Sequence, residues 1–371
     1  MNTLQKIKNL FWVRSLKDYF DRYEKYLLPG ALVVGLLIDA LTFRNINIDT
    51  AFSLLTSYLV ISILTIAYIH AFKEKIFPET KIWESIYVYS PLVIQFTFGA
   101  LLSAIFIFYF FSGTVWVSWP IFLALVILMI VNDSFREYYL KAEVQLGIFY
   151  FILLLFLILV FPFLMNKIGP GIFFLSGAAS LVIFFGLLKL LLYLSTEVDI
   201  KRKGIATIVI LIFSVVNILY FTNIIPPIPL SVRDSGVYYR VDRINGNYQV
   251  VAPQSSWKDY FISSNKIKFS EESEIFVYTA VFAPSDLTEE IIHEWQYYDS
   301  ENEKWDSTDE LSFYLVGGRD GGYRGYSKKS NLKEGHWRVK VETQEGKVLD
   351  IIDFELTKTE DSIKTVERLK R

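Results

Sequence analysis

Long apolar runs alternate with short charged segments over the first 226 residues of the chain. A helix needs about 20 apolar residues to cross a hydrocarbon core of about 30 Å, and seven runs reach or approach that length. They are residues 27–43, 52–72, 86–111, 114–131, 146–165, 171–194 and 205–221. The first is short and contains Asp39, but this acid lies near the end of the run, where the penalty for inserting it is smaller. The pattern predicts about seven transmembrane helices in a membrane domain over residues 27–223.

The hydrophobic period changes from helical to two beyond the segment IIPPIPLS, residues 224–231, whose clustered prolines cannot continue a helix. We expect a proline-rich linker over 224–236 and then short strands, because β-branched and aromatic residues recur between turn pairs such as Asn245-Gly246 and Glu345-Gly346. The strand-like runs are 237–242, 248–252, 275–282, 291–298, 311–316, 337–343 and 348–356. They predict an all-β, immunoglobulin-like sandwich over 237–357. The charged tail, 358–371, is expected to be loosely ordered or a short helix.

Composition divides at the same place. The 371 residues are 53% apolar and 20% charged; residues 1–226 hold 17 basic and 13 acidic side chains, whereas the remainder holds 20 basic and 26 acidic. The first part is suited to membrane lipids and the second to water. Neither part has the basic stripe of a nucleic-acid binder. The absence of cysteine excludes disulfides, thiolate metal sites and thiol catalysis.

Lysine and arginine are distributed unevenly among the connections. Alternate connections, beginning with the N-terminal arm, hold fourteen basic residues, whereas the other set holds only Arg44 and Lys167. Because cytoplasmic loops carry the excess of basic residues, we expect a cytoplasmic N-terminus, an odd number of spans and an extracytoplasmic β domain. The basic arm, 1–26, is either an amphipathic helix on the cytoplasmic membrane surface or an ordinary charged flank. The first apolar run is interpreted as an uncleaved anchor.

Polar residues within the apolar runs are the first candidates for function, because lipid makes them costly unless they have a partner or a task. The candidates are Asp39, Gln95, Asn132, Asp133, Gln145, Lys189 and Asn217, of which the first four are retained as site candidates. We favour structural roles for them, since most lie near helix ends. The alternative is a polar cavity for a lipid, an ion or a proton.

The second candidate is the glycine-rich segment 317–326, GGRDGGYRGY. Its possible ligand-binding residues are Arg319, Asp320, Tyr323, Arg324 and Tyr326. Arginines bind carboxylate or phosphate, tyrosines offer stacking faces, and glycines let a ligand approach the backbone. The segment opens no expected helix, unlike phosphate-binding loops. We favour a strand bulge or turn, with anion or glycan binding as the alternative.

The remaining candidates carry little chemistry. His70, His293 and His336 are isolated and lack metal-ligand spacing, and no catalytic constellation or cofactor motif is evident. Four tryptophans of the β part can form a sugar-stacking platform, although the alternating pattern makes Trp295 and Trp337 core residues rather than surface ones. The other two are Trp257 and Trp305.

Several segments resemble a family of uncharacterised bacterial proteins. In the membrane part they are YEKYLLPGALVVGLLIDALTF, PLVIQFTFGALLSAIFIFYF, SWPIFLAL, VNDSFREYY and IGPGIFFLSGAAS. The segments from HEWQYYDSENEKW through GGRDGGYRGYSKK to GHWRVKVETQEGKVL are similar to the domain of unknown function DUF2914. Where the family has Asn-Glu at the end of the fourth helix, this chain has Asn132-Asp133. The resemblance implies a multi-pass protein of the bacterial inner membrane and supplies no activity.

The sequence therefore favours a non-enzymatic envelope protein whose outer domain binds another envelope protein or an anionic cell-wall glycan. The alternative is transport or handling of a small solute, ion or lipid, with Asp39 and Gln95 in a polar cavity. A membrane-embedded enzyme is a third, less supported hypothesis, because no acid–base or nucleophile constellation is present.

Overall fold

The structure is a computed structural model of the whole chain. It describes residues 48–78, 80–112, 115–134, 141–244, 247–253, 266–270, 273–283, 287–316, 322–359 and 365–370. The expected basic arm, the run 27–43 with Asp39, and Trp257 lie outside the described residues.

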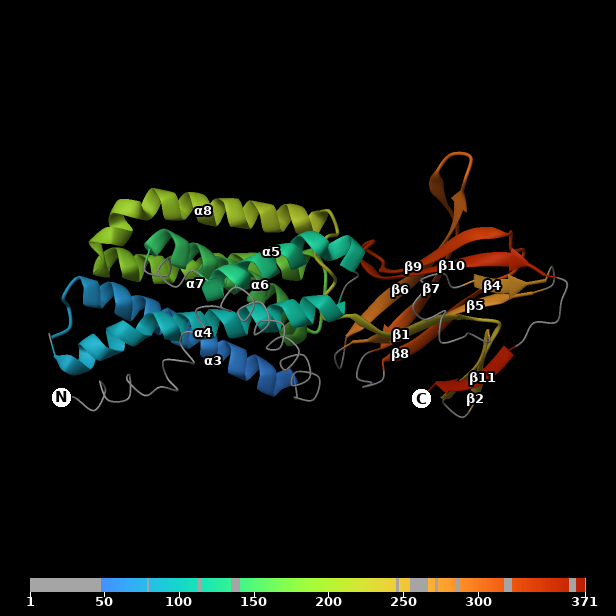
Figure 1. Cartoon of the computed structure of the whole chain (residues 1–371), viewed down its shortest axis with the longest axis horizontal. Helices are drawn as coiled ribbons and strands as arrows, with labels where there is room; N and C mark the ends of the chain where they lie inside the picture. Colours follow the sequence, from blue (N-terminus) through green and yellow to red (C-terminus); the bar gives the residue numbers. More distant parts are fainter. Residues whose placement is uncertain are drawn as a thin grey trace, which may run out of the picture. The chain divides into compact units, whose positions relative to one another are not determined.

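Six helices lie in the described part of the chain (Figure 1). They are α3 (Ile48–Lys73), α4 (Lys81–Ser112), α5 (Val115–Ser134), α6 (Ala142–Met165), α7 (Pro170–Leu194) and α8 (Thr196–Phe221). All except α5 are long and apolar enough to cross a membrane; the apolar stretch of α5, Val117–Asn132, is shorter. The expected count of seven helices is corrected to six for the described residues, because the first apolar run falls outside them. The other six runs each coincide with a helix.

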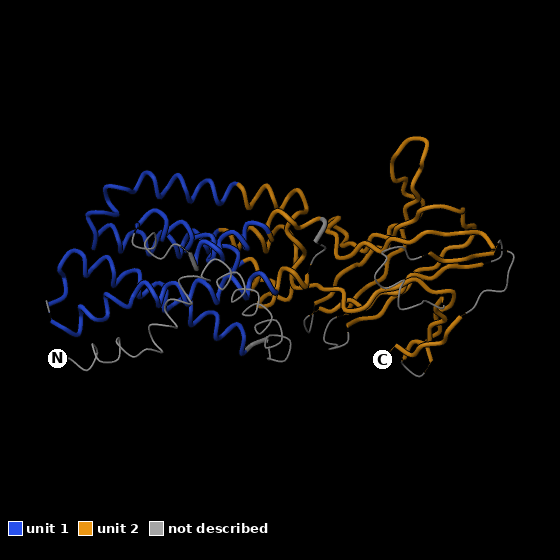
Figure 2. Tube along the Cα trace, in the orientation of Figure 1, with its two compact units in different colours: residues 1–107, 123–157, 178–214 blue, residues 108–122, 158–177, 215–371 orange. Residues whose placement is uncertain are grey.

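The chain forms two compact units (Figure 2). The first runs to residue 107 and adds residues 123–157 and 178–214, whereas the second comprises residues 108–122, 158–177 and 215–371. The second unit therefore combines the β domain with one end of each helix from α4 to α8. The change from apolar to polar sequence near residue 226 does not coincide with the boundary between the compact units.

Buried polar side chains join the helices of the first unit. The hydroxyls of Ser62 in α3 and Thr97 in α4 are hydrogen-bonded at 2.8 Å. Asn132 in α5 donates its side-chain amide to the backbone carbonyl of Gln95 in α4 at 3.0 Å. Such contacts satisfy polar groups that lipid cannot hydrogen-bond, and they hold neighbouring helices together.

The β domain of the second unit contains eleven described strands in three sheets. They are β1 (Ser231–Tyr238), β2 (Arg240–Ile244), β3 (Asn247–Pro253), β4 (Lys266–Phe269), β5 (Ile275–Phe282), β6 (Thr288–Asp299), β7 (Lys304–Val316), β8 (Tyr323–Lys329), β9 (Gly335–Thr343), β10 (Val348–Lys358) and β11 (Thr365–Lys370). The strand orders are β1-β5-β8, β4-β10-β9-β6-β7 and β11-β3-β2. Only β4 and β10 pair in parallel; the other neighbours are antiparallel.

The first two sheets pack around one buried core, which confirms the expected β sandwich. The core joins Val277 and Val281 of β5 to Trp295 of β6 and Trp337 of β9. Along β9 the buried apolar side chains alternate with Arg338, Lys340 and Glu342, as the sequence predicted. The third sheet packs on the other face of β5, where Tyr248 and Val250 meet Tyr278 and Ala280.

Several strand predictions were wrong. The run 237–242 belongs to two strands of different sheets, and β1 already begins at Ser231, within the expected linker. Residues 365–370 form β11 on the edge of β3 instead of a loose or helical tail. β4 was not expected, and β8 replaces part of the expected glycine-rich loop. In each case pairing with a strand distant in the sequence determines the secondary structure of a segment whose local pattern is weak.

The turn between β9 and β10 lies against the end of α8 within the second unit. The ammonium of Lys347 lies 3.5 Å from the centroid of the Tyr220 ring and donates to the Tyr220 carbonyl at 3.2 Å. A cation is favourable there because the carbonyls at a helix C-terminus carry partial negative charge. Burial lowers the pKa of Lys347 to about 8. Ile168, between α6 and α7, also packs against the sandwich core.

The Trp295→Ala substitution should lower the free energy of unfolding of the β domain by about 3–5 kcal/mol. The ring is fully buried and packs edge-on against Phe354 at a centroid distance of 6.1 Å. Trp305→Ala is the matched control and should cost about 1 kcal/mol, because Trp305 is half-buried beneath the Arg338 guanidinium at 4.2 Å. Hydrogen exchange of the strand amides in the full-length protein measures both losses. Equal losses would contradict the assignment of Trp295 as the central core residue.

Candidate functional site

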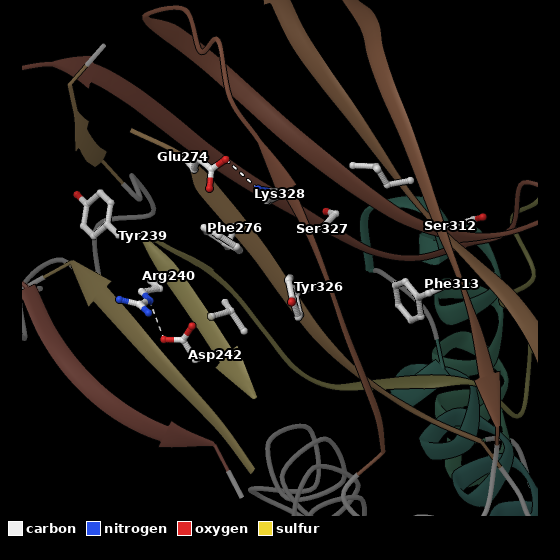
Figure 3. Close-up of a pocket in the computed structure, with 12 residues that line it drawn as sticks. Tyr239, Arg240, Asp242, Glu274, Phe276, Ser312, Phe313, Tyr326, Ser327 and Lys328 are labelled. Atoms are coloured by element: carbon white, nitrogen blue, oxygen red, sulfur yellow. Dashed lines mark hydrogen bonds and ion pairs between the residues drawn. The ribbon is translucent and has the colours of Figure 1, made fainter. Parts of the chain in front are cut away.

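A groove of about 680 Å³ opens beside strand β8 of the sandwich (Figure 3). This volume lies within the usual range of ligand-binding pockets, about 300–1,000 Å³. The groove is lined by Tyr239, Arg240, Val241, Asp242, Glu274, Phe276, Leu311, Ser312, Phe313, Tyr326, Ser327 and Lys328. These residues come from β2, β5, β7 and β8 and from the positions that precede β2 and β5.

Aromatic side chains form much of the groove surface. Tyr326 lies between Phe276 on one side and Phe313 on the other (Figure 3). Its ring is 43% exposed and contacts Phe276 at a centroid distance of 5.9 Å. Phe313 reaches the groove by packing over Gly325, where an added Cβ would lie 2.5 Å from its ring. Glycine at this position in β8 is therefore explained by the close approach of an aromatic ring.

The charged residues at the rim are arranged in pairs. Arg240 and Asp242 are joined at 2.7 Å, and Lys328 and Glu274 at 2.9 Å (Figure 3). Exposed ion pairs of this kind are weak, about 0–1 kcal/mol, so they do not prevent a ligand from competing for either partner. Each of these two pairs has a net charge of zero.

Ser327 connects the groove to a buried hydrogen-bond network. Its hydroxyl oxygen accepts the Trp295 indole N–H at 3.0 Å and lies 2.9 Å from Nδ1 of His293. Nε2 of His293 lies 2.9 Å from Oγ1 of Thr279. Because His293 is fully buried, desolvation lowers its pKa to about 3, and the ring is neutral at physiological pH. The network joins β5 and β8 of one sheet to β6 of the other.

The contact between a serine hydroxyl and a histidine also has the geometry of a nucleophile and its base. However, Ser327 is only 5% exposed, and its oxygen already accepts the Trp295 N–H. The second ring nitrogen of His293 meets a threonine hydroxyl rather than a carboxylate. We therefore interpret His293 as a neutral structural residue that connects the two sheets.

The glycine-rich candidates are only partly described. Tyr323, Arg324 and Tyr326 lie on β8, whereas Arg319 and Asp320 lie outside the described residues. Tyr323 stacks on Phe313 with a centroid distance of 6.4 Å, whereas Tyr326 lines the groove. The described part of the segment thus contributes to a candidate site as an edge strand of a sheet.

The intramembrane candidates are only partly described. Asn132 donates to the Gln95 carbonyl and is 2% exposed, which supports the structural role that the sequence favoured for Asn132. The side chain of Asp133 and all of Asp39 lie outside the described residues.

The sequence pointed to His70 and Gln145 separately, but not to the buried polar cluster that they form in the first unit. Nε2 of His70 in α3 lies 3.1 Å from Oε1 of Gln145 in α6. Nδ1 of the same ring lies 3.4 Å from Oγ of Ser195. All three side chains are buried. Nearby, Lys73 and Glu197 form an ion pair at 2.9 Å. The residues are far apart in the sequence, so no local spacing could have indicated the cluster.

The described tryptophans of the β domain lie in two kinds of environment. Trp295 and Trp337 are core residues, as expected, and Trp305 packs between Tyr298 and Arg338. Among the described residues no group of three or more His, Cys, Asp or Glu side chains can hold a metal ion.

Comparison with known proteins gives a family match for part of the β domain, which includes the groove residues of β7 and β8 but not those of β2 and β5. Residues 288–356 match the family described as a protein of unknown function, DUF2914, which supports a C-terminal domain of unknown function. No curated protein matches the sequence.

Solved structures show only weak similarity. An immunoglobulin-like protein from Pseudomonas aeruginosa has 10% identity and a TM-score of 0.21, covering 34% of this chain and 96% of its own. A β-glucosidase from Listeria innocua in complex with gluconolactone has 14% identity and a TM-score of 0.18; 30% of this chain matches 16% of the glucosidase. An alkylpurine DNA glycosylase from Pseudomonas fluorescens has 11% identity and a TM-score of 0.21, over 76% of this chain and 83% of its own. These TM-scores carry no argument about function.

Replacing His293 should change the pH dependence of stability. Its pKa is about 3 in the folded domain and about 6.5 in an unfolded chain. As the pH falls below about 6.5, the imidazole is protonated in the unfolded chain but not in the folded domain. His293 therefore lowers the free energy of unfolding in this pH range. The stability advantage of the wild type over His293→Gln should shrink by about 2 kcal/mol between pH 7.5 and pH 5.

The difference between variants is the useful quantity, because burial raises the pKa of Glu289 to about 7 and this carboxyl has the opposite pH dependence. Hydrogen exchange of β6 and β8 amides in the full-length protein measures the difference in stability between the wild type and His293→Gln at each pH. The exposed His336 is the matched control, and His336→Gln should leave the profile unchanged. If the difference in free energy of unfolding between wild type and His293→Gln does not change with pH, the interpretation of His293 as a neutral buried residue is wrong.

Proposed function

We propose that this chain is a non-enzymatic membrane protein of the bacterial cell envelope whose β sandwich binds an envelope component in the groove beside β8. The observation that carries the proposal is the open groove, with an exposed Tyr326 and aromatic neighbours, partly formed by the residues that match DUF2914. Aromatic side chains that remain exposed in a concave surface are typical of recognition sites. The apolar helices supply the membrane anchor.

The distribution of basic residues supports an extracytoplasmic position for the groove. Residues 73–84, 132–145 and 195–204 hold eight lysines and arginines, whereas the connection between α6 and α7 carries only Lys167. By the excess of positive charge in cytoplasmic loops, α8 leads from the cytoplasm to the outside. The alternative of transport depends on Asp39 and Gln95, and Asp39 lies outside the described residues.

Topology can be tested with reporter fusions. Alkaline phosphatase fused after Arg371 should be active, because the enzyme folds only outside the cytoplasm in an oxidising compartment. A fusion of the truncated chain after Lys75 should be inactive, since this residue lies in a basic connection. The reverse pattern would place the groove in the cytoplasm and remove the envelope ligand from consideration.

Binding in the groove can be tested by photo-crosslinking in living cells. A benzophenone amino acid at Tyr326 should give a light-dependent adduct with an envelope component. The matched control is the same amino acid at Tyr314, which is 65% exposed on β7 but does not line the groove. The mass of the adduct distinguishes a protein from a glycan. Equal adducts at both positions, or none at Tyr326, would contradict the proposed site.

A further inference from the structure

One edge of β8 borders the groove. In the described part of the chain β8 pairs only with β5, and it is therefore the end strand of its sheet. The backbone carbonyl of Arg324 accepts the Tyr248 hydroxyl at 3.2 Å, so this carbonyl points away from β5. Alternate residues of a strand direct their N–H and C=O groups to the same edge. The backbone groups of Tyr326 and Lys328, which line the groove, therefore also point away from β5.

We infer that the groove takes an extended peptide segment of a partner protein, which adds to β8 as a further antiparallel strand. This inference rests on the proposed function and specifies its ligand. A strand edge presents donors and acceptors at a two-residue repeat of about 6.8 Å, which another peptide backbone matches. Alternate side chains of the added strand meet Leu311 and Phe313 on one face and Tyr326 and Phe276 on the other.

The charges of β8 define the preferred segment further. Arg324, Tyr326 and Lys328 alternate along the strand and share one face. Arg324 forms no ion pair with a carboxylate among the described residues, and the pair between Lys328 and Glu274 is exposed. Opposite charges attract across neighbouring strands. The preferred segment therefore carries acidic residues on both sides of an apolar or aromatic residue on this face.

A second copy of β8 fits less well. Antiparallel pairing of two β8 strands centred on Tyr326 would set Arg324 of each copy opposite Lys328 of the other. Like charges directly opposite are destabilising, so the cross-strand charges disfavour this pairing.

A glycan also fits less well. The Tyr326 ring is inclined by 45° to Phe276 and by 75° to Tyr248, so its neighbours present ring edges and no continuous flat platform for sugars.

Synthetic peptides test the inference on the full-length protein in detergent micelles. The probe is fluorescein-labelled Val-Glu-Val-Tyr-Val-Glu-Val, whose symmetric sequence places two acids beside a central tyrosine on one face. Fluorescence anisotropy should show binding. Methylation of the backbone nitrogens of Glu, Tyr and Glu should weaken binding at least tenfold, because these N–H groups face β8 in the antiparallel pairing. Methylation of the valine nitrogens, on the opposite edge, should change the affinity less than twofold.

A charge exchange provides the second arm. The peptide Val-Lys-Val-Tyr-Val-Lys-Val should bind the wild type about tenfold more weakly than the glutamate probe, because two attractive cross-strand pairs become repulsive. The double variant Arg324→Glu with Lys328→Glu should reverse this preference. The matched control is Lys268→Glu with Lys333→Glu, two exposed lysines that do not line the groove, and it should leave the preference unchanged.

The inference is overturned if the two methylated probes bind equally, if the glutamate and lysine probes bind equally, or if no probe binds at millimolar concentration. Displacement of the bound probe by an N-acetylglucosamine oligosaccharide would also overturn it, in favour of a glycan site. If crosslinking at Tyr326 succeeds and the peptides fail, the recognition function stands and strand addition is rejected. If the peptides bind as expected and crosslinking fails, the groove accepts strands but the proposed envelope ligand is rejected.

Discussion

The requirement that every buried backbone N–H and C=O group has a hydrogen-bond partner underlies both parts of this protein. Helices meet it within a single segment, which is why long apolar runs become α3 to α8. Strands meet it only through neighbours, and a sandwich always leaves end strands. β8 is such an end strand, and the groove lies along its open edge. In the described part of the chain the candidate site thus lies along a strand edge that pairs with no second strand.

The same residues that stabilise the sandwich also shape the groove. Ser327 faces the groove on one side and joins Trp295 and His293 on the other. Phe313 packs over Gly325 from the facing sheet and thereby fixes the separation of β7 and β8. Because the polar members of this network are buried and satisfied, they favour one arrangement of the two sheets. The shape of the groove therefore depends on the core behind it.

The glycine-rich segment shows why the site was only partly predictable. Its composition favoured a turn or bulge, and its arginines and tyrosines suggested a loop that binds an anion or a glycan. The structure instead makes Tyr323 to Lys329 an edge strand, because β5 supplies a partner and Phe313 requires a glycine opposite its ring. Tyr326 was correctly singled out, but its neighbours in the groove, such as Phe276 and Leu311, are distant in the sequence. No local spacing brings these residues together.

The sequence by itself determined the partition into apolar helices and a β-rich domain, the approximate bounds of six helices, and the alternation that buries Trp337, Val339 and Val341. These features depend on the local period of apolar residues, which a single segment contains in full. Only the tertiary structure decided which strand lies at the edge of a sheet, that residues 365–370 pair with β3, and that His70 meets Gln145 and Ser195. Those outcomes depend on contacts between segments far apart in the chain, where the free energy of pairing and packing outweighs local preference.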